Sequence, residues 1–156
     1  MIRNTLLSIH ILAIITWIGA GFFELYLGRR FLAAKGTVLE APLIRIVYGS
    51  DLVVFGATIV AFVAGIAMAI YEGYWFFTVL WLGIKQAIMV LVIIIVCFIF
   101  PTAMKLNAAI KLLPDGLGPV TDDIRDLYLK LEPWYWLMRV LALMAVFLAV
   151  WRPTSL

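Results

Sequence analysis

Hydrophobic residues make up 66% of this chain of 156 residues and charged residues only 13%, whereas soluble domains average about 45–50% apolar and about 25% charged residues. A water-soluble fold of this length could not hide so much apolar surface, so the composition predicts an integral membrane protein whose partner is the lipid bilayer. The formal charge of +3 does not indicate a nucleic-acid partner, because the basic residues cluster beside apolar segments. The single cysteine, Cys97, excludes an intrachain disulfide and any multi-cysteine metal site.

Four segments reach the length of about 20 apolar residues that a membrane-crossing helix needs. They cover residues 5–27, 51–71, 76–104 and 134–151, the third of them interrupted near its end by Pro101. The first segment is interpreted as a retained span, because it is about twice as long as the core of a secretion signal. Long apolar runs in one chain can cross lipid only as helices. The sequence therefore predicts an all-α fold, a four-span transmembrane helical bundle that forms one domain over residues 1–156.

The three connections differ in character. The first, residues 28–50, mixes apolar and basic residues and is expected to form a short amphipathic helix on the membrane surface, broken by Gly36 and Pro42. The second is the tight hairpin Glu72-Gly73-Tyr74-Trp75. The third, residues 105–133, contains a turn over Pro114–Pro119 and then a second short amphipathic helix, with Thr121 as its candidate N-cap and acidic residues in its first turn.

Basic residues predict the orientation in the membrane. Eight of them lie in the first and third connections and two lie on the opposite side; the eight are Arg29, Arg30, Lys35, Arg45, Lys105, Lys111, Arg125 and Lys130, and the two are Arg3 and Arg152. Because cytoplasmic loops carry the excess of lysine and arginine, both long connections are expected in the cytoplasm and both termini outside. Four tryptophans near span ends, Trp75, Trp134, Trp136 and Trp151, are interpreted as an interfacial belt.

Ionisable residues inside the spans fall into two layers in this orientation. Glu24, Asp51 and Arg139 are expected together in the inner leaflet, where an arginine paired with a carboxylate would offset the cost of burying charge. A structural ion pair is the preferred interpretation of this layer, and a proton path or a substrate clamp is the alternative. His10 and Lys85 are expected together in the outer leaflet. They cannot form a salt bridge, but each has a lone pair for iron when neutral.

His10 is the chain's one histidine, and it shares a helix face with Trp17 and Glu24 at spacings of seven residues. Gly21 and Gly28 lie on the same face and are expected to leave room for a flat group beside an aromatic ring. A second interpretation remains open. The histidine would then bond to a serine, a threonine or a backbone carbonyl, and the glycines would serve helix packing.

Several short motifs are similar to those of the bacterial membrane protoporphyrinogen oxidases of the HemJ type. The first span resembles that family in its histidine, its tryptophan–glycine step and the arginine that follows. The matching segments are His10 to Gly21, Gly28-Arg29-Arg30-Phe31, Trp81-Leu82-Gly83-Ile84-Lys85 and Ala149-Val150-Trp151-Arg152-Pro153. The same layout is shared by uncharacterised predicted integral membrane proteins and, more distantly, by copper-resistance membrane domains. The family's second histidine is absent where this chain has Phe31-Leu32-Ala33-Ala34, which favours the uncharacterised branch.

The resemblance implies a b-type haem or a porphyrin in a bacterial cytoplasmic (inner) membrane protein. It assigns His10 as the haem-iron ligand, Lys85 as a partner at the site and Arg29 as a candidate for binding a porphyrin carboxylate. Trp17, on the same helix face as His10, is a further candidate for contact with the cofactor. No catalytic residue follows from it. If the protein is an enzyme, the resemblance implies an oxidoreductase like protoporphyrinogen oxidase.

Three functions therefore stay open. The first is a haem or porphyrin protein in redox or tetrapyrrole chemistry, with a membrane electron-transfer partner. The second is a non-enzymatic membrane subunit or scaffold. The third is a transport element for a small solute or a metal, for which four spans are few, so that a homodimer or another oligomer would be needed.

Overall fold

The computed structural model describes residues 1–74 and 80–151. Within them the chain forms four helices, α1 (Ile2–Ala33), α2 (Glu40–Tyr71), α3 (Leu80–Lys111) and α4 (Asp122–Trp151). All four are long and apolar enough to cross a membrane. The predicted all-α, four-span architecture is confirmed. At about 1.5 Å per residue the helices are about 45–48 Å long, which exceeds the hydrocarbon core of about 30 Å and carries their ends into the headgroup layers.

Some sequence predictions fall on residues outside the described ranges. These are the start of the third span at Phe76, the belt residue Trp75, and Arg152 and Pro153 of the last motif.

The two amphipathic segments are not separate surface helices, and that expectation was wrong. The first continues from Glu40 into the second span, and the second continues from Asp122 into the fourth span. Pro42 does not break the helix because it lies in the first turn of α2, where a missing backbone N–H needs no partner. The predicted break at Gly36 does occur, since this residue has a φ of 76° in the turn between α1 and α2. Acidic residues begin α4 as predicted.

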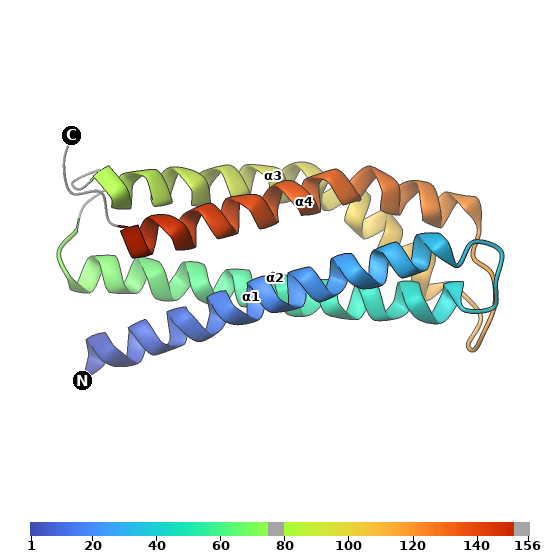
Figure 1. The fold of residues 1–156 in the computed structure, drawn as a ribbon, viewed down its shortest axis with the longest axis horizontal. Coiled ribbons are helices and arrows are strands. Elements are labelled where there is room, and N and C mark those ends of the chain that lie inside the picture. Colours follow the sequence, from blue (N-terminus) through green and yellow to red (C-terminus); the bar gives the residue numbers. More distant parts are fainter. Residues whose placement is uncertain (75–79, 152–156) are drawn as a thin grey trace.

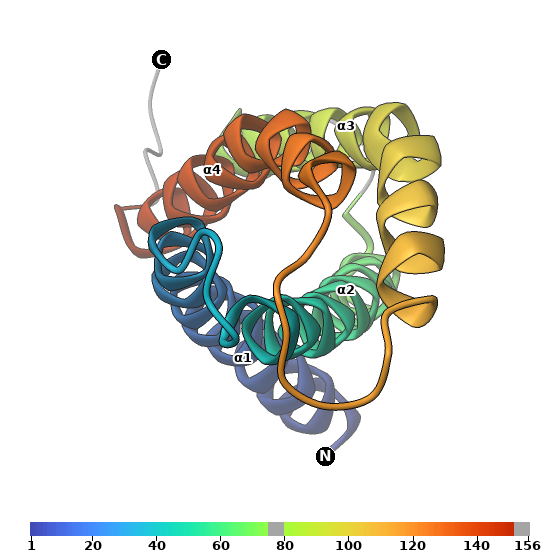
Figure 2. The same cartoon turned by 90° about the vertical axis from the view of Figure 1, so that its right-hand side faces the viewer.

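The helices pair as two hairpins. α1 packs mainly against α2 and α3 mainly against α4, with fewer contacts between the hairpins. Figure 1 shows the start of α1, the end of α2, the start of α3 and the end of α4 at one end of the bundle, called here the terminal end. The α1–α2 and α3–α4 connections lie together at the opposite end, called here the connection end. Figure 2, viewed from the connection end, shows the longer connection, between α3 and α4, passing across the bundle to α2.

Packing is densest between the middle of the bundle and the connection end. The largest fully buried side chains lie there and include two carboxylates; they are Tyr128, Phe31, Ile44, Leu131, Glu24, Glu40 and Val92. At the terminal end, by contrast, residues 2–12 of α1, 65–71 of α2 and 143–151 of α4 contain no buried residue. On the terminal side of the bundle, Gly83 and Ile88 of α3 are the buried residues nearest the helix ends.

Candidate functional site

His10 is half-buried against α2 near the terminal end. Its Nδ1 lies 2.7 Å from the backbone oxygen of Ala61. A carbonyl oxygen can only accept, so Nδ1 donates, and the neutral ring carries its lone pair on Nε2. Gly65 allows this approach, because a Cβ there would lie 3.0 Å from Cε1 of the imidazole. This is the backbone-carbonyl bond that the second interpretation of His10 predicted. Such a bond also orients the other ring nitrogen, as the supporting bond of a metal-binding histidine does.

Lys85 of α3 lies in the same layer as His10. The two side chains interact electrostatically, as expected for residues at one depth. The Lys85 ammonium lies 5.6 Å from the centroid of the Trp81 ring, one helical turn earlier. This layer therefore brings an oriented imidazole and a cation together between the two hairpins.

The rest of the predicted histidine face is occupied by α4. Trp17 is buried in the hydrophobic core. At Gly21 the Arg139 side chain crosses closely enough for its Nε to donate to the Gly21 carbonyl at 2.7 Å. At Gly28 the Tyr128 hydroxyl fills the space of the missing side chain. The expectation that these glycines leave room for a flat group was wrong, because they serve close helix packing instead.

Arg29 does not belong to the His10 site. Both residues lie on the continuous helix α1, and their separation of 19 residues corresponds to about 28 Å at 1.5 Å per residue. The guanidinium of Arg29 lies 5.7 Å from the centroid of the Trp136 ring, toward the connection end. The role that the resemblance assigns to Arg29, toward a porphyrin carboxylate, stays a prediction.

The predicted ion pair between Glu24 and Arg139 forms. Arg139 Nη2 lies 3.0 Å from Glu24 Oε2, and both side chains are almost fully buried, at 7% and 1% exposure. Together with the bond from Arg139 to Gly21, the pair joins α1 to α4, which otherwise make few contacts. Removing either charge would leave the other uncompensated in the protein interior.

Asp51 lies beside this pair but bonds to a different residue. It accepts a hydrogen bond of 3.4 Å from the Tyr135 hydroxyl, and the Tyr135 ring lies 5.6 Å from the Arg139 guanidinium carbon. The structure thus gathers the three predicted inner-layer residues and adds Tyr135, which the sequence did not reveal. A small cavity of about 10 Å³ adjoins Asp51, with Tyr48, Tyr128 and Tyr135 in its wall. This volume is about that of one water-sized sphere.

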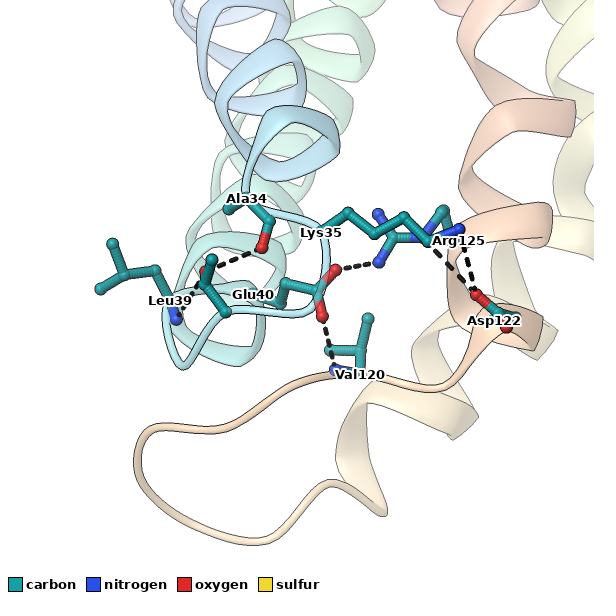
Figure 3. A network of polar contacts seen from close by, with 8 residues as sticks. Ala34, Lys35, Leu39, Glu40, Val120, Asp122 and Arg125 are labelled. Carbon is teal, nitrogen blue, oxygen red and sulfur yellow. Dashed lines mark hydrogen bonds and ion pairs between the residues drawn. The ribbon is translucent and has the colours of Figure 1, made fainter.

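A second buried ion pair, at the connection end, was missed from sequence. Glu40 is fully buried and binds Arg125 of α4, and it also accepts a 3.0 Å hydrogen bond from the backbone N–H of Val120. Figure 3 shows Arg125 reaching toward Asp122 as well, while Lys35 approaches Asp122 from the first connection. Glu40 thereby ties α2 to the start of α4.

The backbone of the two connections reinforces this tie. Gly118 donates to the carbonyl of Val38 at 2.8 Å, and Ala41 donates to the carbonyl of Gly118 at 3.0 Å. Arg45 donates to the carbonyls of Leu113 and Pro114. Glu40 followed by Pro42 two residues later is a signal for the start of a helix, but the partner of Glu40 lies 85 residues away. Only the fold shows that the two meet.

Within residues 1–74 and 80–151, no group of three or more His, Cys, Asp or Glu side chains could hold a metal ion. A metal at His10 would therefore need most of its ligands from elsewhere, as iron in a haem has from the porphyrin nitrogens. No protein-family model, curated protein or solved structure matches this chain.

Proposed function

We propose that this multi-pass membrane protein binds a b-type haem or a porphyrin at the terminal end of the bundle, with Nε2 of His10 as the iron ligand. The observation that carries the proposal is the hydrogen bond from His10 Nδ1 to the Ala61 carbonyl, which orients the ring and leaves the lone pair on Nε2. A haem supplies four of its own iron ligands, so one oriented histidine is a sufficient protein donor.

The surroundings of His10 support this proposal in two ways. Lys85 offers a cation in the same layer for the carboxylates of a porphyrin. Beyond the buried Ala13, Ala61 and Ala64 beside His10, the outermost residues of α1, α2 and α4 are largely apolar and contain no buried residue. Apolar walls at this depth would keep water away from a bound macrocycle. Such a group would supply one-electron chemistry, with a membrane redox partner as the electron acceptor.

A visible absorption spectrum of the detergent-purified protein tests the proposal. We expect a Soret band, either as isolated or after titration with haem, and its loss in His10→Ala. Ser8→Ala is the matched control, because Ser8 is an exposed polar residue on the same helix and its removal should leave the spectrum unchanged. A protein that takes up no haem, or a His10→Ala variant with an unaltered spectrum, would contradict the assignment.

A non-enzymatic membrane scaffold is the second candidate function. It is favoured by the two buried ion pairs, Glu24–Arg139 and Glu40–Arg125, which join the hairpins without involving His10. The same spectra separate the two functions, since a scaffold would remain colourless and unaffected by His10→Ala.

For the membrane setting, we propose a bacterial inner membrane with the connection end in the cytoplasm and both termini outside. The support is the charge distribution. All eight basic residues of the two long connections and their flanking turns lie toward one end of the bundle, whereas Arg3 lies at the other.

A further inference from the structure

The inner polar layer carries unequal charge. Glu24 on α1 and Asp51 on α2 contribute two carboxyl groups, and Arg139 on α4 contributes one guanidinium. If all three were ionised, the layer would hold one uncompensated negative charge within the span. Each such charge is costly in a membrane, so a bound positive charge would stabilise the layer.

The hydrogen-bonding capacity of this layer is also incomplete. Glu24 is only 1% exposed. Neither of its carboxylate oxygens makes a hydrogen bond to any part of the chain that the structure describes, although Oε2 lies in ion-pair contact with Arg139. Nη1 of Arg139 likewise has no hydrogen-bond partner among the described residues. Buried polar atoms are nearly always satisfied, and the described residues offer these atoms no partner beyond the Glu24–Arg139 contact itself.

The groups of the layer form one continuous chain of contacts. Glu24 pairs with Arg139, Arg139 lies over the Tyr135 ring, and the Tyr135 hydroxyl bonds to Asp51. Glu24 and Asp51 also interact electrostatically with each other. The cavity beside Asp51 has room for about one water molecule next to the carboxyl group.

All four helices contribute to these surroundings, and among the described residues Arg139 is the one cation that acts on the two carboxyl groups. α2 adds Tyr48 and α4 adds Tyr128 to the cavity wall, while the lining residues from α3, Leu106 and Ile110, are apolar. The acidic Glu132 of α4 is half-buried, does not line the cavity and interacts with Tyr128. Arg139 disfavours a metal ion beside it by charge repulsion, and the described residues offer no cluster of ligands for one. A proton needs neither a ligand shell nor much space.

We propose that Glu24 and Asp51 together bind one exchangeable proton within the membrane at neutral pH, in a site completed by Arg139 and Tyr135. The proton is taken from water and held on a carboxyl oxygen as an O–H group, so that the layer becomes electrically neutral. This site is separate from His10 and does not depend on haem binding.

Infrared difference spectroscopy of the protein in lipid vesicles, in H2O and in D2O, tests this proposal directly. We expect the wild-type protein at pH 7 to show the C=O stretch of a protonated carboxylic acid that shifts on deuteration. Asp51→Asn and Glu24→Gln should each remove this band, because either change leaves one carboxylate to balance Arg139. Glu132→Gln is the matched control, because this half-buried carboxyl group of α4 does not line the cavity, and it should leave the band in place.

A conservative variant and the wild-type spectrum complete the test. Asp51→Glu preserves the acid, so its band should move in frequency rather than disappear, even if Asp51→Asn assembles poorly. A wild-type spectrum without a protonated carboxyl band at pH 7 would overturn the proposal. So would a band that survives both Asp51→Asn and Glu24→Gln.

Discussion

Among the glycines of α1, Gly28 leaves the least space for a side chain. A Cβ added there would overlap the Tyr128 hydroxyl and come within 2.7 Å of its Cζ. Tyr128 cannot easily move aside, because it is 1% exposed and its ring packs edge-on against Phe31 with centroids 5.5 Å apart. Gly28→Ala should therefore strain the interface between the two hairpins.

The expected magnitude follows from three contributions. Overpacking of a filled core costs about 1–3 kcal/mol, and a disturbed aromatic pair costs about 0.5–1.5 kcal/mol more. The higher helix propensity of alanine returns up to about 1 kcal/mol. Gly28→Ala should lower the free energy of unfolding by about 2 kcal/mol, measured by SDS titration of the detergent-solubilised protein with circular dichroism as the readout.

Gly19→Ala is the matched control, since no atom lies within 4 Å of a Cβ at that position of the same helix. It should be neutral or slightly stabilising. Adding Tyr128→Phe to Gly28→Ala removes the overlapping hydroxyl but leaves Cζ in place, so it should restore only part of the loss. Equal stability of the two alanine variants, or no coupling between residues 28 and 128 in a double-mutant cycle, would refute this account of the packing.

Two further predictions concern the buried ion pairs and use the same titration. Arg139→Ala should lower the free energy of unfolding by about 3–5 kcal/mol, because it leaves Glu24 buried without its counter-charge. Adding Glu24→Leu should make this loss smaller. A loss that is simply additive would contradict the explanation. Glu40→Ala should likewise lower the free energy of unfolding by about 3–5 kcal/mol, because it leaves Arg125 and the backbone N–H of Val120 buried without their partner. Lys35→Ala is the control. It removes only an exposed ion pair at 3.8 Å and should change the free energy of unfolding by less than about 0.5 kcal/mol. Equal effects of Glu40→Ala and Lys35→Ala would contradict the role of Glu40.

The architecture was predictable because length and apolarity alone decide whether a segment can cross lipid. The ion pair between Glu24 and Arg139 was predictable for a related reason, since depth along each span follows from residue count. The Glu40–Arg125 pair was not, because it depends on how two connections fold over each other. Gly21 and Gly28 show the same limit. A small residue on a helix face indicates a close approach, but the sequence does not say whether a cofactor or a neighbouring helix makes it.

The contacts of Arg139 join residues that are far apart in the sequence, and this separation matters for the synthesis and membrane insertion of the chain. Arg139 is synthesised 118 residues after Gly21, whose carbonyl it binds, which at about 5–20 residues per second is a delay of roughly 6–24 s. During that interval the first span already holds Glu24 without its counter-charge. Until α4 is made, Glu24 must therefore be protonated, accessible to water or in contact with a protein of the insertion machinery. Chains that stop before α4 would keep Glu24 without its counter-charge.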